Sequence, residues 1–135
     1  MSVFVDSSAI FAGIATNDSF HADAVGEWSR LIEREEQLVT HSLVEVEAAA
    51  LLQRRVGMEA LAAFNDVLLP RLHVVEIDRE RRRAVLADVA ARGSRQISFV
   101  DYVSFDLMKR SGLDRAFTFD RHFSEAGFEL IGSDR

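Results

Sequence analysis

The sequence predicts an α/β fold in which a mostly parallel sheet of about five strands lies between layers of helices, a three-layer sandwich. Short runs that are apolar throughout, such as Val3-Phe4-Val5, are typical of strands buried on both faces. Longer helical patterns alternate with these runs, and no repeat or linker interrupts them. A chain of 135 residues is most simply one domain, so we expect a single domain over residues 1–135.

Capping residues and apolar periodicity define the elements of the first half of the chain. Asp6 ends the first strand, and Asn17-Asp18-Ser19 is a capping signal for the second helix. Ser42 is expected to cap a long helix that ends before Gly57. The expected strands are 3–5 and 38–39, and the expected helices are 9–15, 20–32 and 42–56.

In the second half, Pro70 is the only proline and is expected to end a helix over 61–68. Asp78 and Ser98 are expected to cap two further helices, which end at Gly93 and Gly112. The expected strands are 72–77, 116–119 and 128–131. One aspartate stands at the start of the last of these helices and another just past the end of the strand that follows it, at one edge of the predicted sheet.

Composition limits the classes of function. The formal charge of −6 gives no overall attraction to nucleic acid, although fifteen of the sixteen cationic side chains are Arg, which holds phosphate bidentately. The absence of Cys excludes disulfides and thiolate metal sites. The start of the chain is unlike a signal peptide, and no apolar run is long enough to span a membrane. We therefore expect a cytoplasmic protein with no membrane partner.

Three acidic side chains stand at the ends of expected elements: Asp6 and Asp120 after strands, and Asp101 at the start of a helix. In parallel sheets, ligands bind beyond the carboxyl ends of strands, where the strand order reverses. Glu45 or Glu47 could supply a fourth acid. Like charges ~4 Å apart repel by about 4 kcal/mol at an effective dielectric near 20, so such a cluster needs a cation. Carboxylates without thiols suit Mg²⁺ or Mn²⁺, which activates water for attack on phosphate esters.

Each acid also has a purely structural interpretation. Asp6 could be only an N-cap, Asp101 the acidic half of a capping box with Ser98, and Asp120 a turn residue. The two glutamates could be solvated helix positions. Taken singly these interpretations suffice, but the predicted topology brings the aspartates to one edge of the sheet, and that joint placement favours a metal site.

Four blocks of sequence resemble the PIN domain family, and most closely its VapC-type ribonuclease toxins and their stand-alone relatives. The blocks are Val3-Phe4-Val5-Asp6-Ser7-Ser8, Val44-Glu45-Val46-Glu47-Ala48, Ser98-Phe99-Val100-Asp101-Tyr102 and Thr118-Phe119-Asp120-Arg121-His122-Phe123. The likeness spans essentially the whole chain. It implies a flavodoxin-like sheet of order 3-2-1-4-5 and cleavage of single-stranded RNA that depends on Mg²⁺ or Mn²⁺. It also implies a homodimer and a small antitoxin protein encoded beside the toxin.

Carried over to this sequence, the resemblance implies that Asp6, Glu47, Asp101 and Asp120 hold the metal and its water. Glu45 stays a rival to Glu47, because the two lie almost opposite each other on a helix and cannot both face one pocket. The hydroxyls of Ser7 and Thr118 would orient the carboxylates or the water. Candidate RNA contacts are Arg54, Arg55 and Arg121, and Asp106 is an extra acid for which we expect a surface position.

Three other functions compete with a ribonuclease toxin. A PIN-type RNA-processing nuclease would need no antitoxin, and a non-catalytic binding module would use the acids only as caps. A phosphoacceptor domain of the response-regulator kind needs a second acid after the first strand and a lysine after the last. Here Ser7 and Ser8 follow Asp6, and the only lysine, Lys109, falls within a helix, so the sequence disfavours that function.

Overall fold

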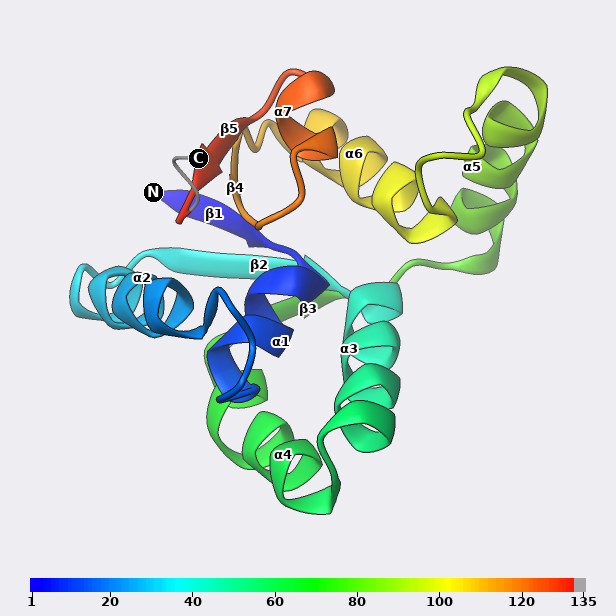
Figure 1. The fold of residues 1–135 in the computed structure, drawn as a ribbon. Helices are drawn as coiled ribbons and strands as arrows, with labels where there is room; N and C mark the ends of the chain where they lie inside the picture. Colours follow the sequence, from blue (N-terminus) through cyan, green and yellow to red (C-terminus); the bar gives the residue numbers. More distant parts are fainter. Residues whose placement is uncertain (133–135) are drawn as a thin grey trace.

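The structure is a computed structural model that describes residues 1–132. Five strands form one sheet in the order β3-β2-β1-β4-β5, and all four neighbouring pairs are parallel (Figure 1). The predicted strand order is thereby confirmed, and the sheet is parallel throughout. The strands are β1 (Ser2–Val5), β2 (Gln37–His41), β3 (His73–Val75), β4 (Arg115–Phe117) and β5 (Glu129–Ile131).

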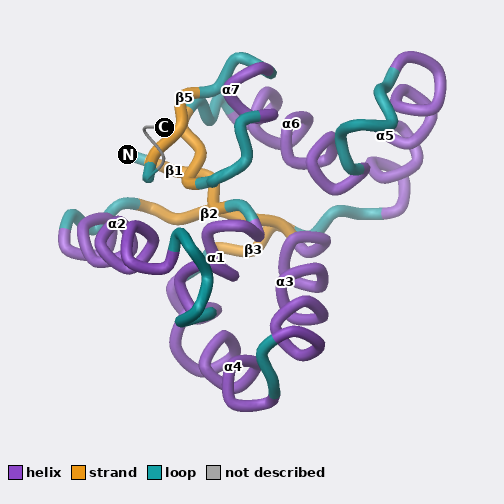
Figure 2. The backbone as a smooth tube through the Cα atoms, in the orientation of Figure 1, coloured by secondary structure: helices purple, strands orange, loops and turns teal. Residues whose placement is uncertain are grey.

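Helices lie on both sides of this sheet, as predicted. Figure 2 shows α1 to α4 gathered on one side, with α6 and α7 on the other and α5 beyond them. The helices are α1 (Ser7–Ile14), α2 (His21–Glu33), α3 (Ser42–Arg55), α4 (Met58–Ala63), α5 (Arg79–Arg92), α6 (Phe99–Ser111) and α7 (His122–Glu125). No helix within residues 1–132 combines the length and the apolar character needed to cross a membrane.

Aromatic side chains on alternate positions of the central strands fill the core on both faces of the sheet. Phe4 of β1 stacks on Phe123 of α7, with ring centroids 6.1 Å apart. Phe117 of β4 meets Trp28 of α2 on the opposite face at 5.2 Å. Successive strand residues point to opposite faces, so a strand covered on both sides must be apolar at every position. Phe4 and Phe117 are fully buried, as that requirement predicts.

The N-cap of α3 is His41 and not Ser42, which corrects the expected cap. The Nδ1 atom of His41 accepts the amides of Leu43 and Val44 at 3.2 and 3.3 Å. The Ser42 hydroxyl instead accepts the amide of Ile77 at 3.0 Å, which ties the end of β2 to the segment after β3. Local sequence favours serine as a cap, but here the long-range bond to Ile77 takes the hydroxyl.

The segment around Pro70 also differs from the expectation. The helix does not end there, because α4 runs into a π-helical turn (Phe64–Leu68) and then a 3₁₀ turn (Leu69–Arg71) that contains Pro70 in its first turn. Proline is tolerated in a first turn, where its missing N–H would have had no intrahelical partner. The sequence also gave no sign of α7, whose four residues are too few for periodicity to be detected.

Candidate functional site

The carboxylate of Asp6 lies at the carboxyl end of β1, beside the end of β4. The backbone N–H of Asp6 donates to the carbonyl oxygen of Phe117 at 3.0 Å, which continues the pairing of the two strands. Its Oδ2 atom accepts the hydroxyls of Ser8 and Thr118, each at 2.8 Å. The same atom accepts the backbone N–H of Ser8 at 3.4 Å and so caps the N-terminus of α1. The capping interpretation of Asp6 is correct for one of its two oxygens.

The other oxygen of Asp6 has no such role. The Oδ1 atom is buried and has no hydrogen-bond partner among the residues that the structure describes. The residue is only 2% exposed, and burial raises the pKa of its carboxyl group, although the hydroxyls of Ser8 and Thr118 oppose that shift. An unpaired carboxylate oxygen in a buried position costs free energy unless something binds it. This atom is therefore available to bind a ligand.

Asp101 lies in the first turn of α6, where the hydroxyl of Ser98 accepts its backbone N–H at 3.1 Å. The residue is 9% exposed. Burial, followed by the negative charges of Asp6, Asp120 and Glu47, raises the pKa of the Asp101 carboxyl group to about 8. Three other carboxylates thus act on this one group, and the raised pKa favours its protonated form at neutral pH.

Asp120 is held three residues beyond β4 by a second set of bonds. Its backbone N–H donates to the Thr118 hydroxyl at 3.0 Å, and its Oδ1 accepts the backbone N–H of His122 at 2.9 Å. The expected strand over 116–119 ends at Phe117, since the Thr118 hydroxyl joins Asp6 to the turn that carries Asp120. The Nδ1 atom of His122 lies 3.1 Å from the same Asp120 oxygen.

Asp101, Asp120 and His122 each offer one ligand atom, and these atoms lie within 4.8 Å of one another. In the sequence, His122 stands out only as a member of the fourth block, and no role as a ligand was expected of it. Its place one residue after Arg121, at the start of the short helix α7, was the only signal, and α7 itself was not predicted.

The structure distinguishes the two candidate glutamates by position. Glu47 lines the same cavity as Asp6, Asp101 and Asp120 and raises the pKa of Asp101. Glu45 lines a different cavity, between α3 and α4, together with Met58. The two side chains thus leave α3 on different sides, as their spacing on a helix requires.

The acidic cavity has a volume of about 540 Å³ and opens between α1, α3 and α6. Of the three arginines expected to contact RNA, Arg54 lines it, whereas Arg55 and Arg121 are exposed and do not. Gln96, which the sequence interpretation did not single out, also lines it. The residues around the cavity are Asp6, Ser7, Ser8, Glu47, Ala50, Leu51, Arg54, Gln96, Ser98, Asp101, Asp120 and His122.

The hydroxyls of Thr118 and Ser7 were both expected to orient the carboxylates or the water, but only that of Thr118 bonds to a carboxylate. Thr118 is fully buried and bridges Asp6 and Asp120, as the sequence interpretation requires of it. Ser7 lines the cavity, but the serine hydroxyl that contacts Asp6 belongs to Ser8. Asp6 also accepts the backbone N–H of Ser8 at 3.4 Å, as the side chain of an N-cap accepts from the second helical residue. Ser8 also accepts the backbone N–H of Phe119, so it fastens the two strand ends together.

Asp106 does not join this cluster. Its carboxylate pairs with Arg81 of α5 at 3.0 Å and lies 3.9 Å from Arg110 on its own helix. Asp6, Glu47 and Asp101 have no arginine or lysine partner within residues 1–132, and only His122 pairs with Asp120. Four carboxylates without an arginine or lysine partner form an oxygen-rich set of ligands, which suits Mg²⁺ or Mn²⁺.

A buried polar contact connects the two helices that carry Glu47 and Asp101. The Nδ1 of His41 accepts backbone amides at the start of α3, so its Nε2 carries the proton and donates to Ser104 of α6 at 2.9 Å. The Ser104 hydroxyl donates to the carbonyl oxygen of Val100 at 3.1 Å. His41 is fully buried, and burial lowers its pKa to about 4, so it is neutral at physiological pH.

Comparisons with known proteins find similarity over nearly the whole of this chain. The family model of the PIN domain matches residues 3–129. The 23S rRNA-specific endonuclease VapC20 of Mycobacterium tuberculosis is 31% identical over 127 residues, which are 93% of this chain and 95% of that protein.

Solved structures show the same fold. The crystal structure of Mycobacterium tuberculosis VapC20, described as a Sarcin-Ricin loop cleaving toxin, superposes with a TM-score of 0.80 at 28% identity and covers 97% of this chain and 98% of that one. VapBC2 from Rickettsia felis, bound to a promoter DNA fragment, gives a TM-score of 0.70 at 12% identity, with 97% and 98% covered. PAE2754 from Pyrobaculum aerophilum gives 0.65 at 22% identity, with 97% and 90% covered.

Proposed function

Since this chain belongs to the PIN domain family, we propose that it is a metal-dependent endoribonuclease and that Asp6, Glu47, Asp101 and Asp120 hold its divalent ion. The observation that carries the proposal is the buried Oδ1 atom of Asp6, which has no partner within residues 1–132 and shares a cavity with the three other carboxylates. If the acids were only caps, each would have its own partner and its own place on the surface.

The second sphere holds the carboxylates in fixed directions. Ser8 and Thr118 occupy Oδ2 of Asp6, so Oδ1 is the atom left for a ligand. Thr118 also positions the Asp120 backbone, and the cap at Ser98 positions Asp101. Such fixed outer contacts preserve the geometry of a metal site and are costly to remove.

A bound Mg²⁺ or Mn²⁺ would supply positive charge that activates a water molecule and stabilises the charge that develops on the leaving oxygen of a phosphodiester. The oxygen ligands suit both ions. We infer that either ion supports activity, and that the imidazole of His122 at the edge of the cluster favours Mn²⁺, since nitrogen ligands suit transition metals better than Mg²⁺.

RNA must approach a protein whose net charge is −6. Arg54 lies at the edge of the acidic cavity and is the best placed cation to hold a phosphate group there. Arg55 and Arg121 are exposed beside the same elements and extend the contact to neighbouring phosphates. Removal of Arg54 should therefore weaken RNA binding more than removal of Arg55.

The experiment that tests the activity is RNA cleavage by the purified protein, free of any partner, with Mg²⁺, with Mn²⁺ and with EDTA. Single-stranded RNA and 23S rRNA are the first substrates, because VapC20 acts on 23S rRNA. Wild type should cut with either ion and not with EDTA. Asp6→Asn and Asp101→Asn should cut at least a hundredfold more slowly while keeping the fold by circular dichroism. Equal cleavage by wild type and both variants would refute the proposal.

We infer further that the protein is the toxin of a toxin–antitoxin pair and forms a homodimer. The support is the identity with VapC20 over nearly the whole of both chains. Exposed apolar side chains on α3 and α4, among them Val46 and Met58 at 65% each, offer a surface that a partner could cover. Expression should arrest growth, and a small protein encoded by the neighbouring reading frame should relieve the arrest and inhibit cleavage. Normal growth with an active nuclease would instead favour an RNA-processing enzyme. Light scattering of the purified protein measures the dimer.

A further inference from the structure

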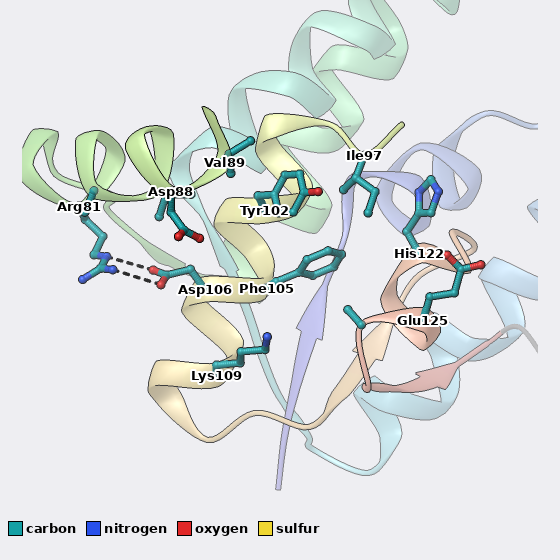
Figure 3. Close-up of a pocket in the computed structure, with 13 residues that line it drawn as sticks. Arg81, Asp88, Val89, Ile97, Tyr102, Phe105, Asp106, Lys109, His122 and Glu125 are labelled. Carbon is teal, nitrogen blue, oxygen red and sulfur yellow. Dashed lines mark hydrogen bonds and ion pairs between the residues drawn. The ribbon is translucent and has the colours of Figure 1, made fainter. Parts of the chain in front are cut away.

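A second cavity of about 620 Å³ lies directly beside the acidic one, between α5, α6 and α7 (Figure 3). His122 lines both cavities. The loop before α6 separates them, because Gln96 and Ser98 line the acidic cavity while Ile97, between them, lines the second. A polymeric ligand bound across the carboxylates could therefore extend past His122 into the second cavity.

The inner wall of this cavity is aromatic and fixed. Figure 3 shows Tyr102 and Phe105 projecting from α6 toward Ile97 and His122. Phe105 packs edge-on against Phe123 with ring centroids 4.9 Å apart, and Tyr102 packs edge-on against Phe105 at 6.0 Å. The Tyr102 hydroxyl accepts the backbone N–H of Ser94 at 2.8 Å, so both ends of this ring are held.

The charges around the cavity do not suit a phosphate group. Arg81 pairs with Asp106 and Asp88 pairs with Arg92, so these side chains are already compensated. Lys109 and Glu125 also line the cavity, and neither forms an ion pair within residues 1–132. One free donor and one free acceptor beside an aromatic wall match a flat, neutral ring with polar edges.

We propose that this cavity receives an unpaired nucleobase of the RNA, from the nucleotide next to the cleaved phosphodiester. This inference rests on the proposed nuclease function, because it takes the acidic cavity as the place of cleavage. The base packs against Tyr102, while Lys109 and Glu125 bind its edge. Arg54, on the acidic cavity, holds the backbone. The single strand thus crosses the acidic cavity with its phosphates on the carboxylate side and one base beyond His122.

The test uses short single-stranded oligoribonucleotides that share one sequence cut by the wild-type protein with Mn²⁺. In two of them, the nucleotide on the 5′ or the 3′ side of the cleaved bond has its base removed. Stacking of a base on an aromatic side chain is worth a factor of about ten or more in binding. We therefore expect one of the two abasic substrates to have a kcat/KM about tenfold lower than the parent, and the other to be close to it.

Two variants, each with a control, test whether the preference for the intact base depends on the cavity. Tyr102→Leu keeps an apolar side chain but loses the stacking surface, so the ratio of kcat/KM for the parent to that for the sensitive abasic substrate should fall from about ten to about one. Tyr102→Phe keeps the ring and should keep the ratio. Val89→Trp fills the cavity from α5 and should also bring the ratio to about one. Leu86→Trp is its matched control, because Leu86 lies on the same helix, is 54% exposed and does not line the cavity.

The outcomes separate this proposal from the activity on which it rests. If no substrate is cut by the wild-type protein, the proposed nuclease function fails first. If the parent is cut, the subsite is overturned when neither abasic substrate is cut more slowly. It is also overturned when Tyr102→Leu lowers kcat/KM equally for parent and abasic substrates, because an equal loss means that Tyr102 only supports Asp101, its neighbour on α6.

Discussion

Burial shifts the protonation of two single residues, Asp101 in the acidic cavity and His41 between α3 and α6. Asp101 is nearly buried beside three other acids, and its pKa rises to about 8. His41 is fully buried, and its pKa falls to about 4. Burial disfavours the charged form of both groups, which explains why the acid and the base shift in opposite directions. Two predictions follow from these groups at the scale of the residue.

Binding of Mn²⁺ should release close to one proton per ion at pH 7, because Asp101 is protonated in the metal-free protein and must ionise to bind a cation. The affinity should rise about tenfold per pH unit up to about pH 8 and then level off. Calorimetric titration in two buffers of different ionisation enthalpy measures the release. Asp101→Asn should release none, and a wild-type value near zero would mean that Asp101 is already ionised.

His41 should make the folding stability depend on pH between about 6.5 and 4. Its pKa is lower in the folded state, so the unfolded chain binds more protons in this window and the stability is lost as the pH falls. The loss between pH 7.5 and 5 should be about 2 kcal/mol. Asp101 acts in the opposite direction, since its raised pKa favours folding at low pH. Only a comparison with a variant therefore isolates His41.

The variant for this measurement is His41→Asn, because asparagine caps a helix well and does not titrate. Urea unfolding at pH 5 and at pH 7.5 gives the change in unfolding free energy for each protein. The wild type should lose about 2 kcal/mol more than the variant over this interval. Parallel pH dependence of the two proteins would show that His41 does not carry the effect.

At the scale of the element, the ends of α6 decide where Asp101 lies. Ser98 caps the helix through the backbone N–H of Asp101, and Gly112 ends it with a φ of 71°. That left-handed conformation is open to glycine without strain. Both ends were predicted from local sequence, because each depends on a contact within one turn of the helix. The cap at Ser98 therefore fixes part of the geometry of the acidic site.

Ser98→Ala should lower the unfolding free energy by about 1 kcal/mol and weaken Mn²⁺ binding severalfold, because the first turn of α6 carries Asp101. Asp78→Ala is the matched control: Asp78 caps α5 by the same kind of bond to Arg81, but lies outside the acidic cavity. It should cost similar stability and leave Mn²⁺ binding as in wild type. Equal effects of both variants on binding would show that the loss comes from general destabilisation.

At the scale of the whole molecule, the acidic cavity joins segments from both ends of the chain. Thr118 bonds to Asp6 across 112 positions of sequence, and Asp6 also bonds across the β1–β4 pair. The carboxylates repel one another wherever no cation is bound, so folding brings together charges that the unfolded chain keeps apart. The metal-free protein is therefore less stable than its core alone would make it.

A divalent ion should stabilise the folded protein against heat. Binding to the folded state alone adds about 2.7 kcal/mol when the free ion is at a hundred times its Kd. For a protein of 135 residues, we expect the Tm to rise by roughly 8 °C. Differential scanning fluorimetry with MnCl₂ and with EDTA measures the rise. Asp6→Asn should show little of it; a full rise in that variant would place the ion elsewhere.

Much of the fold followed from local patterns. Apolar runs located the sheet strands, and the caps of α5 and α6 were where Asp78 and Ser98 predicted them. Features that depend on distant partners were missed. The hydroxyl of Ser42 bonds to Ile77, so His41 takes over the cap of α3. The hydroxyl that bonds to the Asp6 carboxylate is that of Ser8, and the same hydroxyl accepts the backbone N–H of Phe119, which is 111 positions away in the sequence.

The sequence by itself determined the α/β class, the positions of most elements and the acids that stand at their ends, since these depend on periodicity and on contacts within a few residues. Only the tertiary structure decided which glutamate of α3 faces the aspartates, which oxygen of Asp6 stays unpaired and that His122 lies between two cavities. Those facts depend on how β1, β4 and the helices pack, which brings together side chains that no local pattern connects.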